Sequence, residues 1–470
     1  MRKETNSKKQ SGMHPWTILI FILFAAIIAG YLIPSGVYER VITPDGRSAV
    51  DPDTFRFISE SDLSFTGIMT AIPRGIRESI DVIIITFMIG GAFGIIKETG
   101  MLNLGVKVLV KAFKNNKLAI IFVLSAVFAV ITGFIGVPEL ALIYIPVLMP
   151  LLFSLGFDSM TAVAISLTAT AGGFAAAWSA PATVGVGHLL ADLPLYSGMG
   201  VRVITSTILT LISSIYIAIY ARKILKDPES SLVYEDDLLI RDKVEAELKN
   251  EAEDKYPRVR LAGILTVLLF IGLVFGVVIF GWSFSEMSGY FILLGVIPGL
   301  IAGMNLTEVL DAFVVGLKDM IVGAFVIGIA RSIAVVLTDA MVMDTIIMFL
   351  ARFVVVLPSQ IASIGIFIVT TIFNAVIASG SGKAVIALPI MLPLADITEV
   401  TRQTTILAYQ LGDGITNILW PASGYFMAAL AIGNISYKKW VKWALPLLII
   451  WTVVASVILI VLNYIGYGPF

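Results

Sequence analysis

The 470-residue chain has no cysteine and only two histidines, His14 and His188. The absence of cysteine excludes disulfide bonds, thiol chemistry and thiolate metal sites, and two histidines are too few for a histidine-based zinc centre. The 32 basic and 33 acidic residues leave a formal net charge of -1, which excludes nucleic-acid binding through bulk charge. Charged residues make up only 14% of the chain, against about 25% in soluble proteins. An integral membrane protein is therefore predicted.

The chain is rich in long apolar runs, with 58% hydrophobic residues and a mean hydropathy of +0.95. Each run approaches the roughly 20 residues that a spanning helix needs. The uninterrupted runs lie at about 16–33, 80–96, 199–221, 259–281, 287–303, 318–338 and 443–465. Two more runs, 159–190 and 402–432, are broken by glycine and proline. We predict an all-α protein with about nine transmembrane helices, the first being too long for a cleaved signal sequence.

Two regions, 118–155 and 360–395, have a different pattern. Each holds two short apolar arms that are joined by a tip rich in glycine, serine or proline, at 133–139 and 374–383. Arms of this length predict re-entrant helical hairpins, whose polar tips are tolerated only where protein or a cavity surrounds them. The alternative is a pair of ordinary spans with a tight turn.

The distribution of basic residues predicts the topology. With the N-terminus inside, most of the 32 basic residues fall in the predicted inner segments. The predicted outer segments hold eight, namely Arg40, Arg47, Arg56, Arg74, Arg77, Arg202, Arg352 and Arg402. This bias predicts a multi-pass plasma-membrane protein with a cytoplasmic N-terminus. Arg331 and Lys383 remain at membrane depth, and we interpret Arg331 and Asp339, eight residues apart on one helix, as a structural ion pair.

An internal duplication relates the two halves of the chain. Three stretches recur in the same order: 81–90 with 319–328, 145–150 with 388–393, and 180–183 with 420–423. Each unit is a span, an amphipathic helix, a hairpin, a broken span and a span. An odd number of crossings separates equivalent points, so the units are predicted to be inverted repeats, as in many secondary transporters. The predicted parts are an N-terminal span and external loop (1–79), repeat 1 (80–222), a cytoplasmic linker (223–258), two connecting spans (259–317) and repeat 2 (318–470).

Charged and amide side chains concentrate at the tips and breaks. Glu139 lies at the first tip and Lys383 at the second, while Asp413 lies between two glycines and is followed by Thr416 and Asn417. Free N–H groups where a half-helix begins favour carboxylates, and the carbonyls of a broken span favour cations. These residues are our main candidates for substrate binding. Glu139 could instead cap a helix at a protein surface, and Lys383 could extend to the outer interface.

The first break, by contrast, carries no charge. Its candidates are Ser179 and Thr183, although such hydroxyls often bond only to their own helix. The sequence 380–383, Gly-Ser-Gly-Lys, looks like the end of a phosphate-binding P-loop, but Ile377 and Ala384 occupy positions where that motif needs Gly and Ser or Thr. No HExxH, GxSxG or strand-linked GxGxxG motif is present. We therefore expect no enzyme activity, no catalytic residue and no cofactor.

The sequence Gly412-Asp-Gly-Ile-Thr-Asn417 precedes Pro421, and paired prolines follow each tip. On these motifs the chain resembles the YfcC/DcuC-like family of the ion transporter superfamily, and the resemblance extends from about residue 16 to residue 465. The sequence 412–417 is also similar to one in p-aminobenzoyl-glutamate transporters. The resemblance implies arginine/ornithine exchange or C4-dicarboxylate transport, in a homodimer of elevator type in a bacterial inner membrane.

The resemblance also bears on the coupling ion. Sodium-coupled dicarboxylate importers among these relatives carry Ser-Asn-Thr at both tips. This chain has Gly-Val-Pro at 136–138 and Ser379-Gly-Ser381. Ser379 and Ser381 are therefore further candidates for substrate binding, and the coupling ion, proton or sodium, stays open.

The charges of the candidate residues predict the substrate class. Glu139 and Asp413 supply two negative charges and Lys383 one positive charge, so a substrate with one carboxylate and two ammonium groups would neutralise the set. Unpaired buried charges are costly. We predict a secondary transporter for a small amino-bearing carboxylate, most simply a basic amino acid antiporter. A proton- or sodium-coupled carrier of C4-dicarboxylates or other small carboxylates is the alternative. A channel would need a continuous polar stripe, and a receptor would not explain the duplicated breaks.

Overall fold

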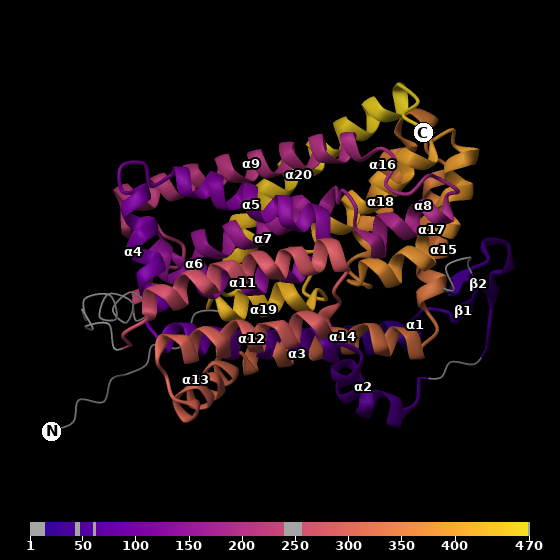
Figure 1. The fold of residues 1–470 in the computed structure, drawn as a ribbon. Helices are drawn as coiled ribbons and strands as arrows, with labels where there is room; N and C mark the ends of the chain where they lie inside the picture. Colours follow the sequence, from indigo (N-terminus) through magenta and orange to yellow (C-terminus); the bar gives the residue numbers. More distant parts are fainter. Residues whose placement is uncertain (1–14, 43–47, 60–62, 239–255, 469–470) are drawn as a thin grey trace.

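The protein is described here by a computed structural model of residues 15–42, 48–59, 63–238 and 256–468 (Figure 1). The described chain is helical apart from two small antiparallel sheets in the segment after the first helix. In these sheets β1 (Gly36–Val37) pairs with β4 (Arg56–Phe57), and β2 (Arg40–Ile42) pairs with β3 (Ser48–Val50). The prediction of a helical membrane protein is confirmed at this level.

The helices of the described residues fall into two halves of the chain. In the first half they are α1 (Pro15–Leu32), α2 (Phe65–Glu78), α3 (Ile80–Glu98), α4 (Met101–Phe113), α5 (Ala119–Ile135), α6 (Ala141–Ser154), α7 (Ser159–Ala175), α8 (Val186–Leu190) and α9 (Met199–Lys226). In the second half they are α11 (Val259–Phe280), α12 (Phe284–Ala302), α13 (Leu306–Asp319), α14 (Ile321–Asp339), α15 (Met343–Val355), α16 (Ser359–Phe373), α17 (Gly380–Ile397), α18 (Arg402–Thr416), α19 (Gly424–Ile432) and α20 (Tyr437–Tyr464).

Within the described residues, five of these helices are long and apolar enough to cross a membrane by length and composition alone: α3, α9, α12, α14 and α20. Short helical turns complete the chain, at Pro52–Thr54 before β4, at Pro138–Leu140 between α5 and α6, at Pro181–Gly185 before α8 and at Pro228–Ser230 after α9. The middle of the predicted linker, residues 239–255, lies outside the described residues, which resume at 256.

Two amphipathic helices, α2 and α13, were not predicted. Both carry several charged residues, so neither has the long apolar run that marks a span. Their starts are nevertheless readable from local chemistry. Ser64 caps α2 through the N–H of Gly67, and Asn305 forms a capping box with Glu308 at the start of α13.

The helices of the two halves match in length and order. α2 and α13 each have 14 residues and begin 241 positions apart, at Phe65 and Leu306. α3 and α14 each have 19 residues and begin the same distance apart, at Ile80 and Ile321. α9 and α20 each have 28 residues. The packing also recurs, since α2 packs against α14 while α13 packs against α3. α4 and α15, which hold matching places, lie at opposite ends of the molecule (Figure 1).

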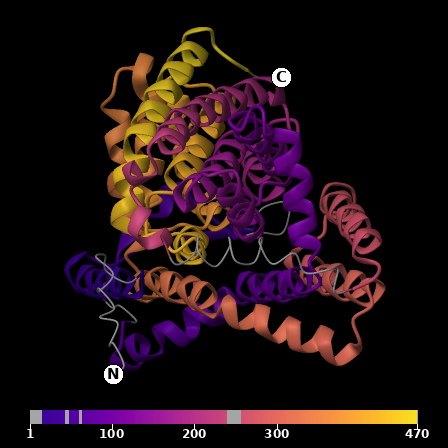
Figure 2. The same cartoon turned by 90° about the vertical axis from the view of Figure 1, so that its left-hand side faces the viewer.

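The helices form two layers (Figures 1 and 2). The lower layer of Figure 1 holds α1, α2, α3, α12, α13 and α14. Within it, α14 packs against α1 and α2, whereas α3 packs against α12 and α13. The upper layer holds the helix pairs α5–α6 and α16–α17 together with α7, α9, α18 and α20. Glycine permits a close crossing of α3 and α13 in the lower layer, because a Cβ on Gly316 of α13 would overlap the carbonyl oxygen of Gly90 on α3.

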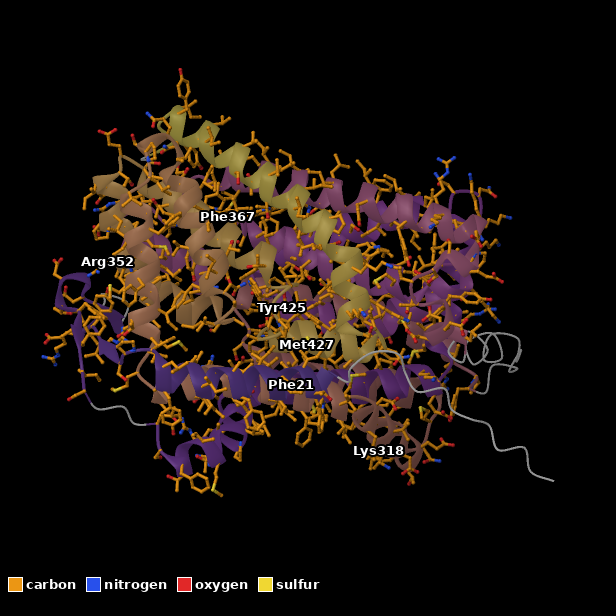
Figure 3. All side chains as sticks on the ribbon, turned by 180° about the vertical axis from the view of Figure 1, so that it is seen from behind. Phe21, Lys318, Arg352, Phe367, Tyr425 and Met427 are labelled. Atoms are coloured by element: carbon orange, nitrogen blue, oxygen red, sulfur yellow. The ribbon has the colours of Figure 1, made fainter. Side chains whose placement is uncertain are left out.

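α19 lies between the two layers. Figure 3 shows its Tyr425 and Met427 between Phe367 of α16 above and Phe21 of α1 below. The same view places Lys318, on a predicted inner segment, and Arg352, on a predicted outer one, toward opposite ends of the long helices. The described fold is therefore compatible with the topology predicted from the basic residues.

Ion pairs join α2 to α14 and correct one prediction. Arg74 of α2 makes two bonds to Asp339 at the end of α14, of 2.7 and 2.6 Å. Arg331 pairs instead with Glu78, at 3.0 Å between Nε and Oε2. The predicted pair of Arg331 with Asp339 is thus wrong, because both residues find their partners on a helix that the sequence analysis had treated as loop.

Candidate functional site

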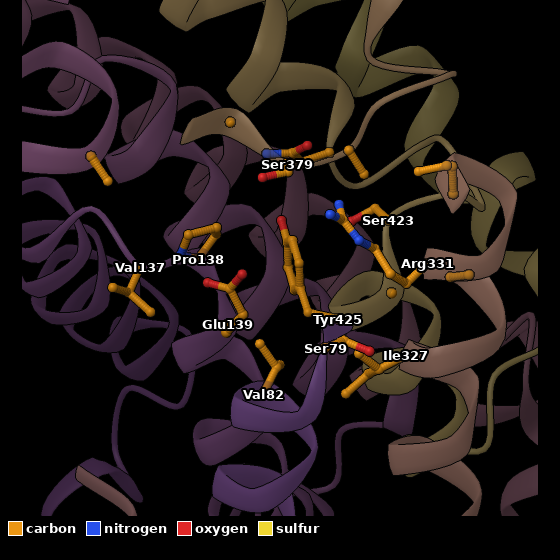
Figure 4. A pocket seen from close by; sticks show the side chains of 18 of the residues that line it. Ser79, Val82, Val137, Pro138, Glu139, Ile327, Arg331, Ser379, Ser423 and Tyr425 are labelled. Carbon is orange, nitrogen blue, oxygen red and sulfur yellow. The ribbon is translucent and has the colours of Figure 1, made fainter. Parts of the chain in front are cut away.

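A cavity of about 340 Å³ lies between the two layers (Figure 4). The two predicted tips and the two helix breaks contribute to its wall, and the lower layer supplies residues of α12, of α14 and of the junction between α2 and α3. The lining residues from the tips and breaks are 136–139, Phe174, Ala182, Thr183, Val376, 378–380, Asn417 and 422–425. Those from the lower layer are Glu78, Ser79, Val82, Phe284, Ile327, Ala330, Arg331 and Ala334. The four segments singled out in the sequence therefore meet at one cavity.

Glu139 is the acid that the first tip presents to this cavity. α5 ends at Gly136, which takes a left-handed φ of 72°, and Pro138 then begins the short turn that carries Glu139. The carboxylate lies beside Tyr425 in Figure 4. Among the described residues no basic side chain pairs with Glu139. It is therefore free to meet a positively charged group that enters the cavity.

The lower layer contributes a guanidinium and a second carboxylate, both missed as site residues by the sequence analysis. Arg331 of α14 and Glu78 of α2 line the cavity and pair with each other, and their side chains remain 37% and 42% exposed. Arg331 had been noticed at membrane depth, but Glu78 was placed in an external loop. Only the unpredicted helix α2 brings Glu78 to the cavity wall.

Several uncharged polar groups at the cavity lack partners. The hydroxyls of Thr183 and Tyr425 are buried and make no hydrogen bond within the described structure. Ser379 caps α17 by accepting from the N–H of Gly382 at 3.3 Å, and the first N–H groups of that helix precede its intrahelical bonds. Buried polar atoms are nearly always satisfied in folded proteins. Unpaired hydroxyls at a cavity wall are what a polar ligand would satisfy.

Lys383 and Asp413 lie behind the cavity wall, paired with each other. Lys383 Nζ lies 2.7 Å from Asp413 Oδ1 and 2.7 Å from Asn374 Oδ1, and both charged side chains have 0% exposure. Asn374 Nδ2 donates to the Asp413 carbonyl at 2.9 Å, to Thr416 Oγ1 at 2.9 Å and to Asn417 Oδ1 at 3.0 Å. We call Lys383, Asp413, Asn374, Thr416 and Asn417 the buried polar cluster. It fastens the second tip to α18.

The position of Asp413 differs from the prediction. Asp413 lies in the last turn of α18, and the break begins only at Asn417. The glycines on either side serve close packing: a Cβ on Gly412 would lie 2.6 Å from the carbonyl oxygen of Phe367 in α16, and a Cβ on Gly414 would overlap Ala175 in α7. The polar residues thus belong to a helix end that is packed tightly between two neighbours.

The nine predicted site residues fall into distinct groups. Glu139, Thr183, Ser379 and Asn417 line the cavity, whereas Lys383, Asp413 and Thr416 lie behind it. Ser179 donates to the carbonyl of Phe134 and is not among the lining residues. The side chain of Ser381 lies outside the described part of the structure.

Asn374 and Tyr425 were missed by the sequence analysis. Asn374 caps the C-terminus of α16 inside an otherwise apolar arm, and an amide at such a helix end is a signal that can be read from sequence. Tyr425 has no such signal, because a tyrosine in an apolar helix resembles a core residue.

Among the described residues, no group of three or more histidine, aspartate or glutamate side chains gathers as a metal site would require.

Comparison with known proteins identifies relatives along nearly the whole chain. A family model described as DcuC, C4-dicarboxylate anaerobic carrier, matches residues 14–464. An Escherichia coli K12 protein described as "Putative basic amino acid antiporter YfcC" is 29% identical over 492 residues, with 96% of each chain covered. An uncharacterized protein of Haemophilus influenzae is 28% identical over 414 residues, which cover 87% of this chain and 81% of the relative.

Two solved transporters are similar at lower levels. MtrF of Neisseria gonorrhoeae, described as one of a class of antimetabolite efflux pumps, gives a TM-score of 0.41 at 16% identity, covering 96% of this chain and 95% of that chain. The YdaH transporter of Alcanivorax borkumensis gives a TM-score of 0.42 at 16% identity, covering 97% of this chain and 100% of that chain.

Proposed function

Because the chain belongs to the DcuC family of membrane transporters, we propose that it is a secondary active transporter that exchanges basic amino acids such as arginine and ornithine across the plasma membrane. The observation that carries the choice of substrate is the set of charges at the cavity. Glu78, Glu139 and Arg331 line it, and together they bear one net negative charge. Lys383 and Asp413 cancel each other behind the wall.

A basic amino acid carries one carboxylate and two cationic groups, which are two ammonium groups in ornithine and an ammonium and a guanidinium group in arginine, and its net charge of +1 neutralises this set. A C4-dicarboxylate would raise the negative charge of the same set instead. Charges that stay uncompensated away from water cost several kcal/mol each. The proposal therefore keeps the charge balance predicted from the sequence, with two acids and one base at the cavity. Glu78 takes the role predicted for Asp413, and Arg331 takes the role predicted for Lys383.

Complementary groups surround the cavity on two sides. In the view of Figure 4, Glu139 and Arg331 lie on opposite sides of the Tyr425 ring. We assign the substrate carboxylate to Arg331 and to the first N–H groups of α17, which favour anions. The ammonium groups are assigned to Glu139 and Glu78, with hydrogen bonds to Thr183, Ser379, Asn417 and Tyr425 from the wall.

The transport movement is proposed to be of elevator type, with the two halves as inverted repeats and the helix pairs α5–α6 and α16–α17 as re-entrant hairpins. The opposite placement of α4 and α15 supports inverted repeats, and the position of the cavity between the layers supports a sliding of one layer past the other. The lower layer is the fixed scaffold in this proposal, and it is the natural site of a homodimer contact. The N-terminus is assigned to the cytoplasm on the basic-residue bias.

Proton-coupled transport of C4-dicarboxylates is the second candidate. It is favoured by the family description and by the guanidinium of Arg331 at the cavity. A dianion would add to the net negative charge of the lining residues, so this function requires that protons accompany the substrate and neutralise Glu139 and Glu78.

Counterflow in proteoliposomes distinguishes the two candidates. Vesicles that contain the purified protein are loaded with an excess of unlabelled ornithine or succinate, and uptake of the labelled compound is followed without an ion gradient. We expect labelled ornithine and arginine to accumulate in ornithine-loaded vesicles, with acetate and succinate inert. Accumulation of succinate alone, in succinate-loaded vesicles, would refute the basic amino acid assignment.

A further inference from the structure

The buried polar cluster has the composition of a site for a monovalent cation. Lys383 Nζ is held by a carboxylate oxygen of Asp413 and an amide oxygen of Asn374, each at 2.7 Å. These two oxygens belong to the last turn of α18 and to the C-cap of α16. Helix C-termini carry partial negative charge and favour cations, and the same kinds of oxygen at broken transmembrane helices coordinate sodium ions in secondary transporters.

The position of Lys383 on its own helix is unfavourable for a positive charge. Lys383 is in the first turns of α17, which begins at Gly380, and the N-terminal end of a helix disfavours positive charge. A buried ion pair also adds little net stability, because removing both charges from water costs about as much free energy as their attraction returns. Its presence here therefore calls for a reason other than the folding of α17.

The first half of the chain folds the matching elements without such a cluster. Counted from the prolines that the two units share, the matching residues are Leu140 for Lys383, Ile131 for Asn374 and Gly173 for Asp413. The contact of a helix pair with its neighbouring broken helix is thus made in one half without a buried charge. Of the two tips, which both lie in the described structure, the second has this cluster and the first does not.

One oxygen atom of the buried polar cluster has no hydrogen-bond partner in the described structure. This atom, Asp413 Oδ2, is buried. It faces the backbone of the second tip so closely that a Cβ on Gly380 would lie 2.5 Å from it. With the lysine side chain removed, Asp413 Oδ1 and the amide oxygen of Asn374 would face the vacated space, and Asp413 Oδ2 on the same carboxylate would still lack a partner.

We infer that the Lys383 ammonium is a tethered cation that fills an alkali-metal position between the second tip and α18. The tip is therefore held on α18 in every transport cycle without a sodium ion. This inference concerns the closure of the tip and does not depend on which substrate enters the cavity.

The test measures the thermal stability of purified protein in sodium chloride and in choline chloride at equal ionic strength. Three forms are compared: wild type, Lys383→Ala, and the double variant Lys383→Ala with Asp413→Asn, which removes both charges. We expect the melting temperature of Lys383→Ala to rise with sodium in a saturable way, by about 3 °C or more, since a ligand of the folded state alone stabilises it. The wild type and the double variant should respond to neither salt.

Two results would overturn the inference: a sodium response in the wild type, or a Lys383→Ala variant that responds no more than the double variant. Should Lys383→Ala fold poorly, the wild type alone still decides. Its melting temperature is expected to be equal in sodium chloride and in choline chloride, and a saturable rise with sodium would contradict a permanently filled site. Because the melting experiment uses no substrate, a failure of the proposed function leaves its result interpretable.

Discussion

Asp413→Asn is expected to abolish transport and to destabilise the protein, because it leaves the Lys383 ammonium buried without a counter-charge. Removing one partner of a buried pair typically costs about 3–5 kcal/mol, and about 3 kcal/mol already corresponds to roughly 100-fold in an equilibrium constant. Both partners are fully buried, at 0% exposure, so water cannot replace the lost counter-charge.

The measurements are the melting temperature and the ornithine counterflow of the same preparation. The matched control is the double variant Lys383→Met with Asp413→Leu, which removes both charges and should recover much of the lost stability without recovering transport. A single Asp413→Asn variant with wild-type stability and wild-type counterflow would show that the pair holds nothing in place.

Glu139→Gln should weaken the binding of ornithine while leaving the fold unchanged. Glu139 lines the cavity, and no basic residue pairs with it among the described residues, so its loss leaves no buried charge behind. A hydrogen bond between charged groups contributes about 1.5–3 kcal/mol. The ornithine concentration for half-maximal counterflow is therefore expected to rise by about 10- to 100-fold, with an unchanged melting temperature.

The control for this variant is Asp311→Asn, which removes an exposed carboxylate on α13 away from the cavity. It should change neither quantity. An unaltered ornithine affinity in Glu139→Gln would contradict the role assigned to Glu139. Increased uptake of succinate by the same variant would favour the dicarboxylate function, because one negative charge has then been removed from a site for a dianion.

The sequence was sufficient for the features that depend on composition and on local chemistry. Apolar runs predicted the long helices such as α3 and α14, because length and hydropathy alone define a span. Glycine, proline and polar residues predicted where the apolar runs are interrupted. The sequence placed the candidate binding residues at those interruptions, and the structure brings the interruptions together at one cavity.

The remaining features depend on tertiary contacts that one sequence does not encode locally. The helix α2 looked like an external loop, so Glu78 and the partner of Arg331 were missed. Asp413 was assigned to a break because two glycines flank it, whereas those glycines permit close contact with α16 and α7. The pairing of Lys383 with Asp413 joins two segments 30 positions apart, and only the packing of the second tip on α18 reveals it.

The central claim is that tips and breaks from both halves of the chain line one substrate cavity. The chain has no natural cysteine, so single cysteine substitutions can report on this cavity without background. Ala182→Cys in the first break and Ser379→Cys at the second tip both line it, and Thr70→Cys on the exposed face of α2 serves as the control. The rate of modification by a charged thiol reagent is measured with and without saturating ornithine. We expect ornithine to slow the reaction at both cavity positions and to leave Thr70→Cys unaffected, whereas unchanged rates at Ala182→Cys and Ser379→Cys would contradict a shared substrate site.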